Sequence, residues 1–336
     1  MNTIRQTLIT LLTLNCIIMY AQFPSNDGTW ELKKEDQFNS YVSADWHNMY
    51  PWGNNNNGAE YNDPANLSYA GGWLKIKSDR KNPPIFNTED SLWYHYQGGA
   101  IQSKFTYKYG YFESSIKTPI GKGYWPAYWL WRATHCQWYD EIDIHERGGD
   151  ISVTSNETSQ SNHWFVQCVN DIDTTTFVKN VDSTINNCAN AHTYSLLWQP
   201  NRLTYYIDGI TIHAKAEYAH PITHDLELIF NFAIDPWTPP NQNTTFPAYF
   251  EIDYIKVWQL KTACSTSESI CTFTKASYDQ KVKKDITIGG TSCNTSMNTS
   301  DAVAFWAKDH IILDKNCTIN ANGSGYICFN TYNCSN

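Results

Sequence analysis

The segment "QWYDEIDIHERGG" contains a six-residue stretch, 141–146, with three carboxylates and two isoleucines that alternate with them. In a β-strand, residues two apart share a face, so Glu141 and Asp143 are expected on one side while Ile142 and Ile144 enter the core. Glu146 is an odd number of steps from Glu141, so a regular strand would turn it toward the core. The spacing therefore raises the question of how the third acid joins the other two.

A β-bulge near residues 144–145, adding one residue, would return Glu146 to the face of Glu141 and Asp143. Carboxylates held this close separate their pKa values, so that one is ionised while another keeps its proton. Hydrolysis of a glycosidic bond by a retaining enzyme uses this division between a nucleophile and an acid, with the two carboxyls about 5–5.5 Å apart. The alternative, a solvated acidic edge strand, is disfavoured by the alternating isoleucines.

Short alternating runs broken by turn residues extend from Trp30 to Leu260, without long helical periodicity. Asp208-Gly209 lies between two of these runs and predicts a tight hairpin. Strands at this spacing favour a β-sandwich or jelly roll. The predicted strands are 73–78, 100–107, 110–118, 127–131, 141–146, 194–199, 203–209, 226–232 and 249–260.

Three blocks of the sequence resemble glycoside hydrolase family 16. Residues 141–146 match its E-x-D-x-x-E signature in the bulged form, residues 107–131 are similar to its Y-G-x-x-E and W-P-A-F-W blocks, and residues 250–259 resemble its closing strand. The resemblance implies an all-β jelly-roll sandwich with a concave substrate cleft. It also implies an endo-acting hydrolase that cuts β-linked polysaccharides with retention of configuration.

Carried over residue by residue, the resemblance implies that Glu141 is the nucleophile, that Asp143 hydrogen-bonds it, and that Glu146 acts as acid and then as base. His145 departs from the apolar residue that many relatives carry, and parity points it away from the acids. Trp129 is expected under the sugar that is cleaved. The resemblance implies substrate contacts at Gln102, Trp125, Trp129, Trp131, Trp138, His163 and Asn231. Of these, Trp125 and Trp138 suit cleft wall and packing equally, and His163 and Asn231 suit sugar contact or burial.

Family members often hold a calcium ion on the convex side of the sandwich, and Asp253 matches the aspartate of the last strand. Gln37 stands where relatives commonly have glutamate, and an amide oxygen brings no charge to a calcium ion. We expect no cofactor for catalysis and, at most, a structural calcium.

The 336 residues divide into three expected parts. Residues 1–21 read as a secretory signal peptide, with Arg5 ahead of an apolar run, so a secreted or cell-surface protein is expected. Residues 22–260 form the predicted catalytic domain. Residues 261–336 are rich in Ser, Thr, Asn and Cys, and are predicted to be a small disulfide-bonded β-appendage of unknown role.

The charge balance limits the partners. Removing Arg5 with the leader leaves 24 − 1 = 23 basic and 33 acidic residues. Nucleic acid is therefore not an expected partner, and no later segment is apolar enough to span a membrane. The 14 Trp and 22 Tyr suit stacking on sugar rings as well as a core. We expect a monomer that binds a polysaccharide.

Three functions compete. The W-P-A-Y-W block favours a β-1,3- or mixed-linked glucan such as laminarin. An algal galactan (agar, porphyran or carrageenan) is the second candidate within the enzyme class. A non-catalytic carbohydrate-binding protein is the third, but a pure binder gains nothing from desolvating three carboxylates together.

Overall fold

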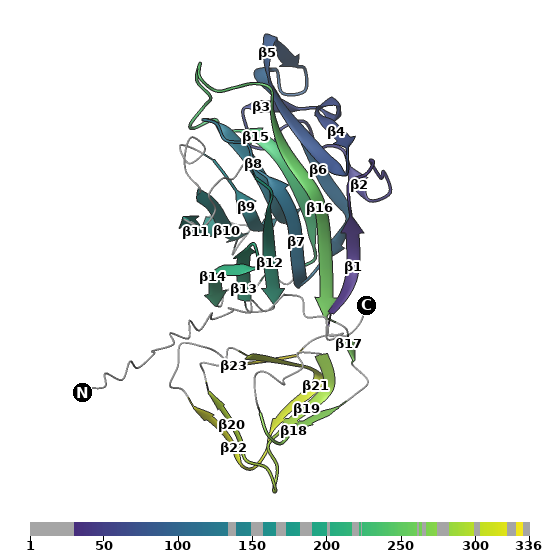
Figure 1. Cartoon of the computed structure of the whole chain (residues 1–336), viewed down its shortest axis with the longest axis vertical. Helices are drawn as coiled ribbons and strands as arrows, with labels where there is room; N and C mark the ends of the chain where they lie inside the picture. Colours follow the sequence, from purple (N-terminus) through teal and green to yellow (C-terminus); the bar gives the residue numbers. More distant parts are fainter. Residues whose placement is uncertain are drawn as a thin grey trace, which may run out of the picture.

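The computed structural model describes residues 30–133, 139–148, 157–165, 173–181, 190–199, 202–216, 222, 224–260, 262–263, 267–273, 282–298, 303–320 and 327–331. The expected leader, residues 1–21, and Trp138 lie outside the described residues. Nearly all described regular structure is β-strand (Figure 1). One short 3-10 turn, η1 (Pro64–Asn66), is the sole helix in these ranges, and none there is long and apolar enough to cross a membrane.

The strands before residue 261 form a curled antiparallel jelly roll of two packed layers. The inner layer is ordered β11–β10–β9–β8–β15–β6, with β2 added to β6. Its strands are β2 (Trp46–His47), β6 (Leu92–Tyr107), β8 (Tyr124–Ala133), β9 (Tyr139–Glu146), β10 (Glu157–Phe165), β11 (Asp173–Val181) and β15 (Leu226–Ile234).

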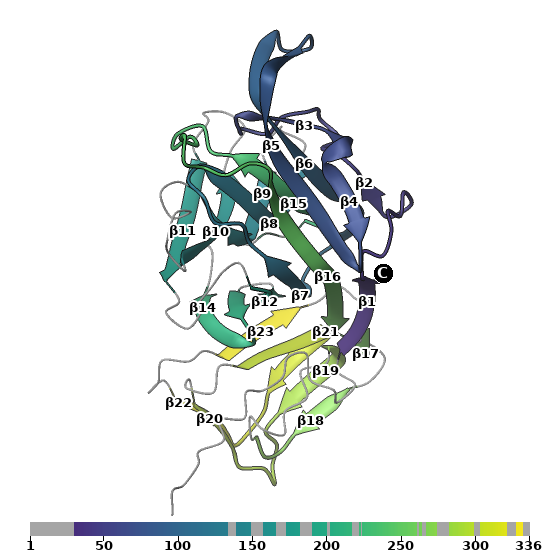
Figure 2. The same cartoon turned by 45° about the horizontal axis from the view of Figure 1, so that its top comes forward.

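The outer layer is ordered β5–β16–β7–β12–β13–β14, with β1 added to β16 and β4 to β5. The long β5 and β6 pair with each other, and their hairpin projects beyond the sandwich in Figure 2. A short strand, β3 (Glu60–Asn62), runs parallel to β6. The outer strands are β1 (Trp30–Asp36), β4 (Leu67–Ala70), β5 (Trp73–Asn87), β7 (Gly110–Lys117), β12 (His192–Gln199), β13 (Arg202–Ile207), β14 (Ile210–Ala216) and β16 (Ala248–Leu260).

The core lies between the two layers. Tyr128 and Leu130 of β8 point into it from the inner layer, and Phe112 and Ile116 of β7 from the outer layer; all are buried. Burying a side chain of this size stabilises the fold by roughly 1.5–3 kcal/mol. Alternate residues of β8 are therefore committed to the core, which leaves the others to line the opposite, concave face.

The predicted strands of the main body are confirmed, with longer bounds for several. The predicted hairpin is also present, because Tyr206 pairs with Thr211 and Ile207 with Ile210 across the turn. Asp208 and Gly209 both have positive φ, +50° and +74°, as a type I′ turn requires. Strands β10 and β11 were not among the predicted runs.

The strands after Leu260 pair only with one another in the described part of the chain. They form parallel pairs, as in a solenoid, around a small separate hydrophobic cluster that includes Ile286 and Phe305. A disulfide joins Cys271 to Cys293. These strands are β17 (Thr262–Ala263), β18 (Glu268–Ile270), β19 (Val282–Ile288), β20 (Thr295–Asn298), β21 (Val303–Leu313), β22 (Cys317–Asn320) and β23 (Ile327–Thr331).

Glu60 of β3 is a fully buried carboxyl that ties this short strand to the inner layer. Its Oε2 accepts a hydrogen bond of 2.7 Å from the backbone N–H of Ile234, and its Oε1 one of 3.1 Å from Asn62 Nδ2. Gly98 makes room for it, since a Cβ there would lie 2.7 Å from Glu60 Cγ. Burial raises the pKa of Glu60 from 4.5 to about 7. The carboxyl is therefore more basic in the folded protein than in the unfolded chain.

This difference predicts a pH-dependent contribution to stability. A raised pKa means that the folded state holds the proton longer, so the stability supplied by protonated Glu60 falls between about pH 4.5 and 7. At about 1.4 kcal/mol per pH unit, the loss is on the order of 3 kcal/mol. The glutamine side chain does not titrate. We therefore expect the stability of Glu60→Gln, measured relative to wild type, to be higher at pH 8 than at pH 4. Denaturant unfolding at both pH values measures this, and an unchanged difference would contradict it.

Candidate active site

The three acids come together because β9 carries one extra residue. On the β8 side, Tyr128 pairs with His145 and Trp129 with Asp143, so Ile144 is left over. On the β10 side, three residue steps of β9, from Asp143 to Glu146, oppose two steps of β10. The predicted bulge is confirmed at its predicted place.

The bulge sends two consecutive side chains into the core. Ile144 and His145 are both buried, at 2% and 0% exposure. Alternation then resumes, so that Glu146 shares the concave face with Glu141 and Asp143. The indole Nε1 of Trp125, from β8, donates a 2.6 Å hydrogen bond to Glu146 Oε1.

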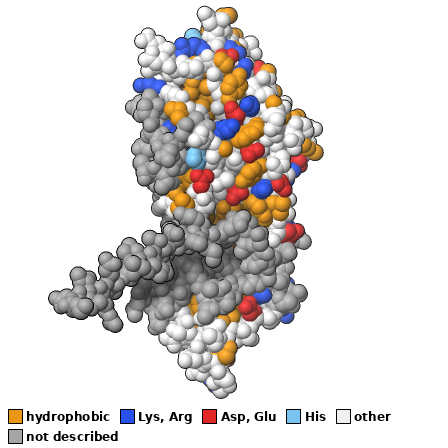
Figure 3. Space-filling model, viewed as in Figure 1, with side chains coloured by type: hydrophobic (Ala, Val, Ile, Leu, Met, Phe, Trp, Pro, Cys, Tyr) orange, Lys and Arg blue, Asp and Glu red, His pale blue; other side chains and the backbone are white. Residues whose placement is uncertain are grey.

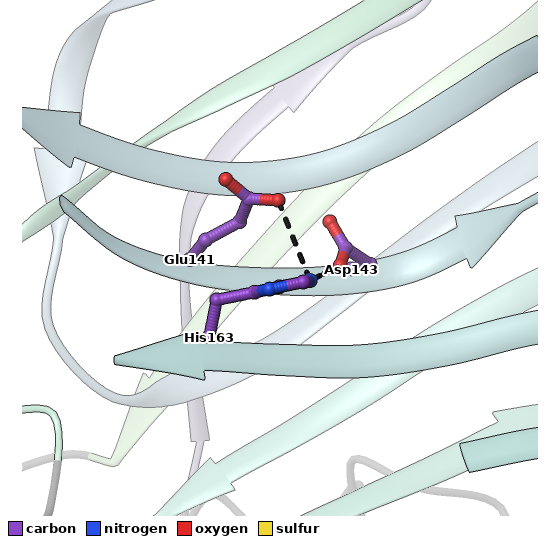
Figure 4. A group of neighbouring side chains, drawn as sticks. All are labelled: Glu141, Asp143 and His163. Carbon is purple, nitrogen blue, oxygen red and sulfur yellow. Dashed lines mark hydrogen bonds and ion pairs between the residues drawn. The ribbon is translucent and has the colours of Figure 1, made fainter. Parts of the chain in front are cut away.

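Asp143 is the buried centre of the group, and its carboxylate accepts hydrogen bonds from two side chains. The hydroxyl of Ser161 and Nε2 of His163, both on β10, bond to its Oδ2, the latter at 3.1 Å. The same His163 nitrogen lies 3.7 Å from Glu141 Oε1, so the ring joins the two acids (Figure 4). A carboxylate can only accept hydrogen bonds, so Nε2 carries the proton in this arrangement. His163, for which sugar contact and burial were both predicted, contacts the acids in this structure, and its contact with sugar stays a prediction.

Glu146 is poised to keep its proton at neutral pH. Burial raises the pKa of its carboxyl to about 8, and the negative charge of Asp143 adds to the rise. The hydrogen bond from Trp125 and the charge of His163 act in the opposite direction. A proton-bearing carboxyl beside ionisable acids is the arrangement that general-acid catalysis requires.

Aromatic and amide side chains form the floor next to the acids. Trp129 is 5% exposed and donates a 2.7 Å hydrogen bond from Nε1 to Asn231 Oδ1. Gln102 is buried, and its amide donates to Glu227. Trp131 is half-buried. Asn231 and Gln102 thus bond protein groups in this structure, and their contact with sugar stays a prediction.

Two exposed tryptophans near the acids come from loops that the sequence reading did not single out. Trp52 is 40% exposed, and its ring centroid lies 4.4 Å from that of Trp131. Trp237 is 74% exposed, and its ring lies 5.6 Å from that of Trp125. Ser161 was also missed. No strand-type alternation marks Trp52 or Trp237, because both lie in stretches rich in Pro, Gly and Asn.

Asp253, the predicted calcium ligand, lies at a register shift in β16 and is half-buried. Among the described residues, one cluster brings three or more potential metal-ligand side chains together, and it consists of Glu141, Asp143 and His163. Asp253 is not part of it. The Gln37 amide already donates a 2.6 Å hydrogen bond to Glu35. The amide nitrogen makes that bond, so the Gln37 oxygen could still ligate a calcium ion beside Asp253 and backbone carbonyls, and such a site stays a prediction.

The fold and the site agree with a family comparison. The sequence profile described as "Glycosyl hydrolases family 16" matches residues 46–239. The chain belongs to glycosyl hydrolase family 16. The matched range contains the three acids and every tryptophan named in this subsection.

Two characterised relatives share part of this chain. The endo-1,3-1,4-beta-glycanase ExsH of Rhizobium meliloti (strain 1021) is 29% identical over 50% of this chain and 34% of its own length. A glucan endo-1,3-beta-glucosidase of Cryptopygus antarcticus is 25% identical over 69% of this chain and 93% of its own. The chain thus spans only about a third of ExsH.

Solved structures share the jelly roll. The catalytic domain of an endo-1,3-beta-glucanase (laminarinase) from Thermotoga petrophila RKU-1 superposes with a TM-score of 0.58 at 23% identity, covering 69% of this chain and 99% of that one. Porphyranase B from Zobellia galactanivorans gives a TM-score of 0.60 at 18% identity, covering 69% and 93%. At these identities the likeness establishes the fold alone.

The hydrogen bond from Trp125 predicts a measurable change in the pH profile. Because it stabilises the ionised form of Glu146, Trp125→Phe should raise the pKa of Glu146 and move the basic limb of kcat/KM upward by roughly 0.5–1 pH unit. Trp131→Phe, which does not remove a donor to Glu146, is the control and should leave the limb in place. An unmoved limb in Trp125→Phe would mean that this hydrogen bond does not tune the acid.

Proposed function

We propose that this chain is a retaining, endo-acting hydrolase of β-linked polysaccharide, with β-1,3- or mixed-linked glucan as its substrate. The observation that carries the proposal is the bulge in β9, which places Glu146 on the same face as Glu141 and Asp143. A solvated acidic edge would leave all three acids ionised. Here the raised pKa of Glu146 keeps this carboxyl protonated, so it can serve as the acid while Glu141 serves as the nucleophile.

The proposed reaction has two steps. Glu141 attacks the anomeric carbon while Glu146 gives its proton to the departing glycosidic oxygen, and a covalent glycosyl-enzyme forms. Glu146, now ionised, takes a proton from water as the water attacks the same carbon and releases Glu141. Asp143, held by Ser161 and His163, lies between the two, and its charge contributes to the raised pKa of Glu146.

The substrate assignment is supported by the surroundings of the acids and by the names of relatives. A floor of tryptophan and amide groups suits an uncharged sugar, which offers apolar ring faces and hydroxyls. On the face shown in Figure 3, charged side chains of both signs are scattered among uncharged ones rather than gathered in a basic patch. ExsH and the Cryptopygus antarcticus protein are both named for β-1,3 linkages. Export through residues 1–21 and a monomeric state are part of the same proposal.

Substitution of the nucleophile tests the reaction. Residues 22–336 would be incubated with laminarin, lichenan, agarose, porphyran and κ-carrageenan, and new reducing ends counted. We expect release from laminarin or lichenan, and a loss of at least about 10³-fold in Glu141→Gln. Glu251→Gln, at a surface ion pair with Lys75 in the outer layer, is the matched control and should keep full activity. Wild-type turnover in Glu141→Gln would refute the assignment, and cleavage of a galactan alone would replace the substrate.

Azide rescue tests the acid/base and the stereochemistry. Glu146→Ala removes both the proton donor and the general base, so hydrolysis should fall sharply on a substrate with a poor leaving group. With an activated aryl glycoside, azide should restore turnover and give a β-configured glycosyl azide by attack on the covalent intermediate. An α-configured product, identified by NMR, would indicate single displacement and contradict retention.

A further inference from the structure

His145 is a polar side chain at the bulge, and the mechanism gives it no direct task. It is fully buried, and it faces the space between the two layers rather than the cleft. Its ring centroid lies 3.9 Å from that of Tyr194 on β12 of the outer layer. An apolar side chain would fill such a place without needing hydrogen-bond partners.

Both ring nitrogens of His145 have a threonine partner. Nε2 lies 2.9 Å from Oγ1 of Thr118, which follows β7 of the outer layer. Nδ1 lies 2.7 Å from Oγ1 of Thr158 on β10 of the inner layer. The ring therefore links the strand that carries the acids to the facing layer and to the neighbouring strand.

The directions of these hydrogen bonds follow from the number of protons. Burial, with the nearby charges of Arg147 and His192, lowers the pKa of His145 well below 6.5, so the ring is neutral with one N–H. The Thr158 hydroxyl has one proton and donates it to the carbonyl of Glu146, 3.3 Å away. With the Thr158 proton directed to that carbonyl, Nδ1–H donates to Thr158 and Nε2 accepts from Thr118.

We propose that His145 is a positioning residue, which acts through the chain from Thr118 to the carbonyl of Glu146 and fixes the direction in which the acid projects. The inference rests on the proposed function for the role of Glu146. A bulge has an unpaired residue and a disrupted ladder, so its backbone is less constrained than that of a regular strand. The hydrogen bonds of His145 supply the missing constraint from inside the sandwich. Rotation of Glu146 by a small amount would remove it from Trp125 and from the glycosidic oxygen.

Three substitutions separate this role from simple packing. His145→Leu fills the space but removes both hydrogen bonds. His145→Gln keeps one donor and one acceptor, and Thr118→Val removes only the bond from the outer layer. We expect kcat to fall about 10–100-fold in His145→Leu with KM changed less than about threefold, and to fall less in the other two. The basic limb of kcat/KM should move in His145→Leu and return toward the wild-type position in His145→Gln.

A core control and a second measurement make the test decisive. Ile255→Val, in β16 of the outer layer, alters a buried core residue whose strand partners are Asp36 and Ser114 rather than a neighbour of His145, and it should leave kcat and the basic limb unchanged. The pKa of Glu146 would also be followed by infrared titration of its carboxyl band, using Glu146→Gln to assign the band. Wild-type kcat and an unmoved carboxyl pKa in His145→Leu would overturn the positioning role, as would equal losses in Ile255→Val. If wild type cleaves no polysaccharide, the proposed function fails, yet the infrared titration still decides whether His145 sets the environment of Glu146. Should His145→Leu not fold, Thr118→Val gives the same decision.

Discussion

One inserted residue in β9 governs the chemistry of this protein. Without it, Glu146 would lie on the core side of the inner layer, where an unpaired carboxyl costs several kcal/mol or is forced to stay neutral. With it, Ile144 and His145 enter the core in succession, and Glu146 returns to the concave face. The rest of the sandwich, including the paired strands on both sides of β9, holds this local irregularity in place.

Gathering three carboxylates also raises an electrostatic cost, and the site reduces it by two separate means. Asp143 is buried but holds two donors, from Ser161 and His163. Glu146 instead keeps its proton, because burial and the charge of Asp143 raise its pKa to about 8. The same repulsion that would destabilise three ionised acids therefore produces the acid that the proposed reaction needs.

The sequence alone was sufficient for features that depend on local periodicity. The alternation in residues 141–146 predicted the strand, and the parity of Glu146 predicted the bulge. It was insufficient where the partner is far along the chain. Nothing near residue 145 indicates Thr118, 27 residues earlier and in the other layer. Strand β10, which supplies Ser161 and His163, was absent from the runs predicted by alternation, because polar residues occupy most of its positions on both faces.

The register of the inner layer also indicates how a polysaccharide would lie on it. Residues that face one another across neighbouring strands form rows perpendicular to the strands, and Glu141 and Glu146 fall in the two outer rows with Asp143 in the row between. Under the proposed mechanism, a sugar attacked by Glu141, with its glycosidic oxygen protonated by Glu146, would lie over the middle row, and its chain would cross β9. Trp129 lies in the middle row beside Asp143, and its expected contact with the sugar stays a prediction. The rows, read from β15 through β8 and β9 to β10, are Glu227–Trp131–Glu141–His163, Ile229–Trp129–Asp143–Ser161 and Asn231–Ala127–Glu146–Ser159.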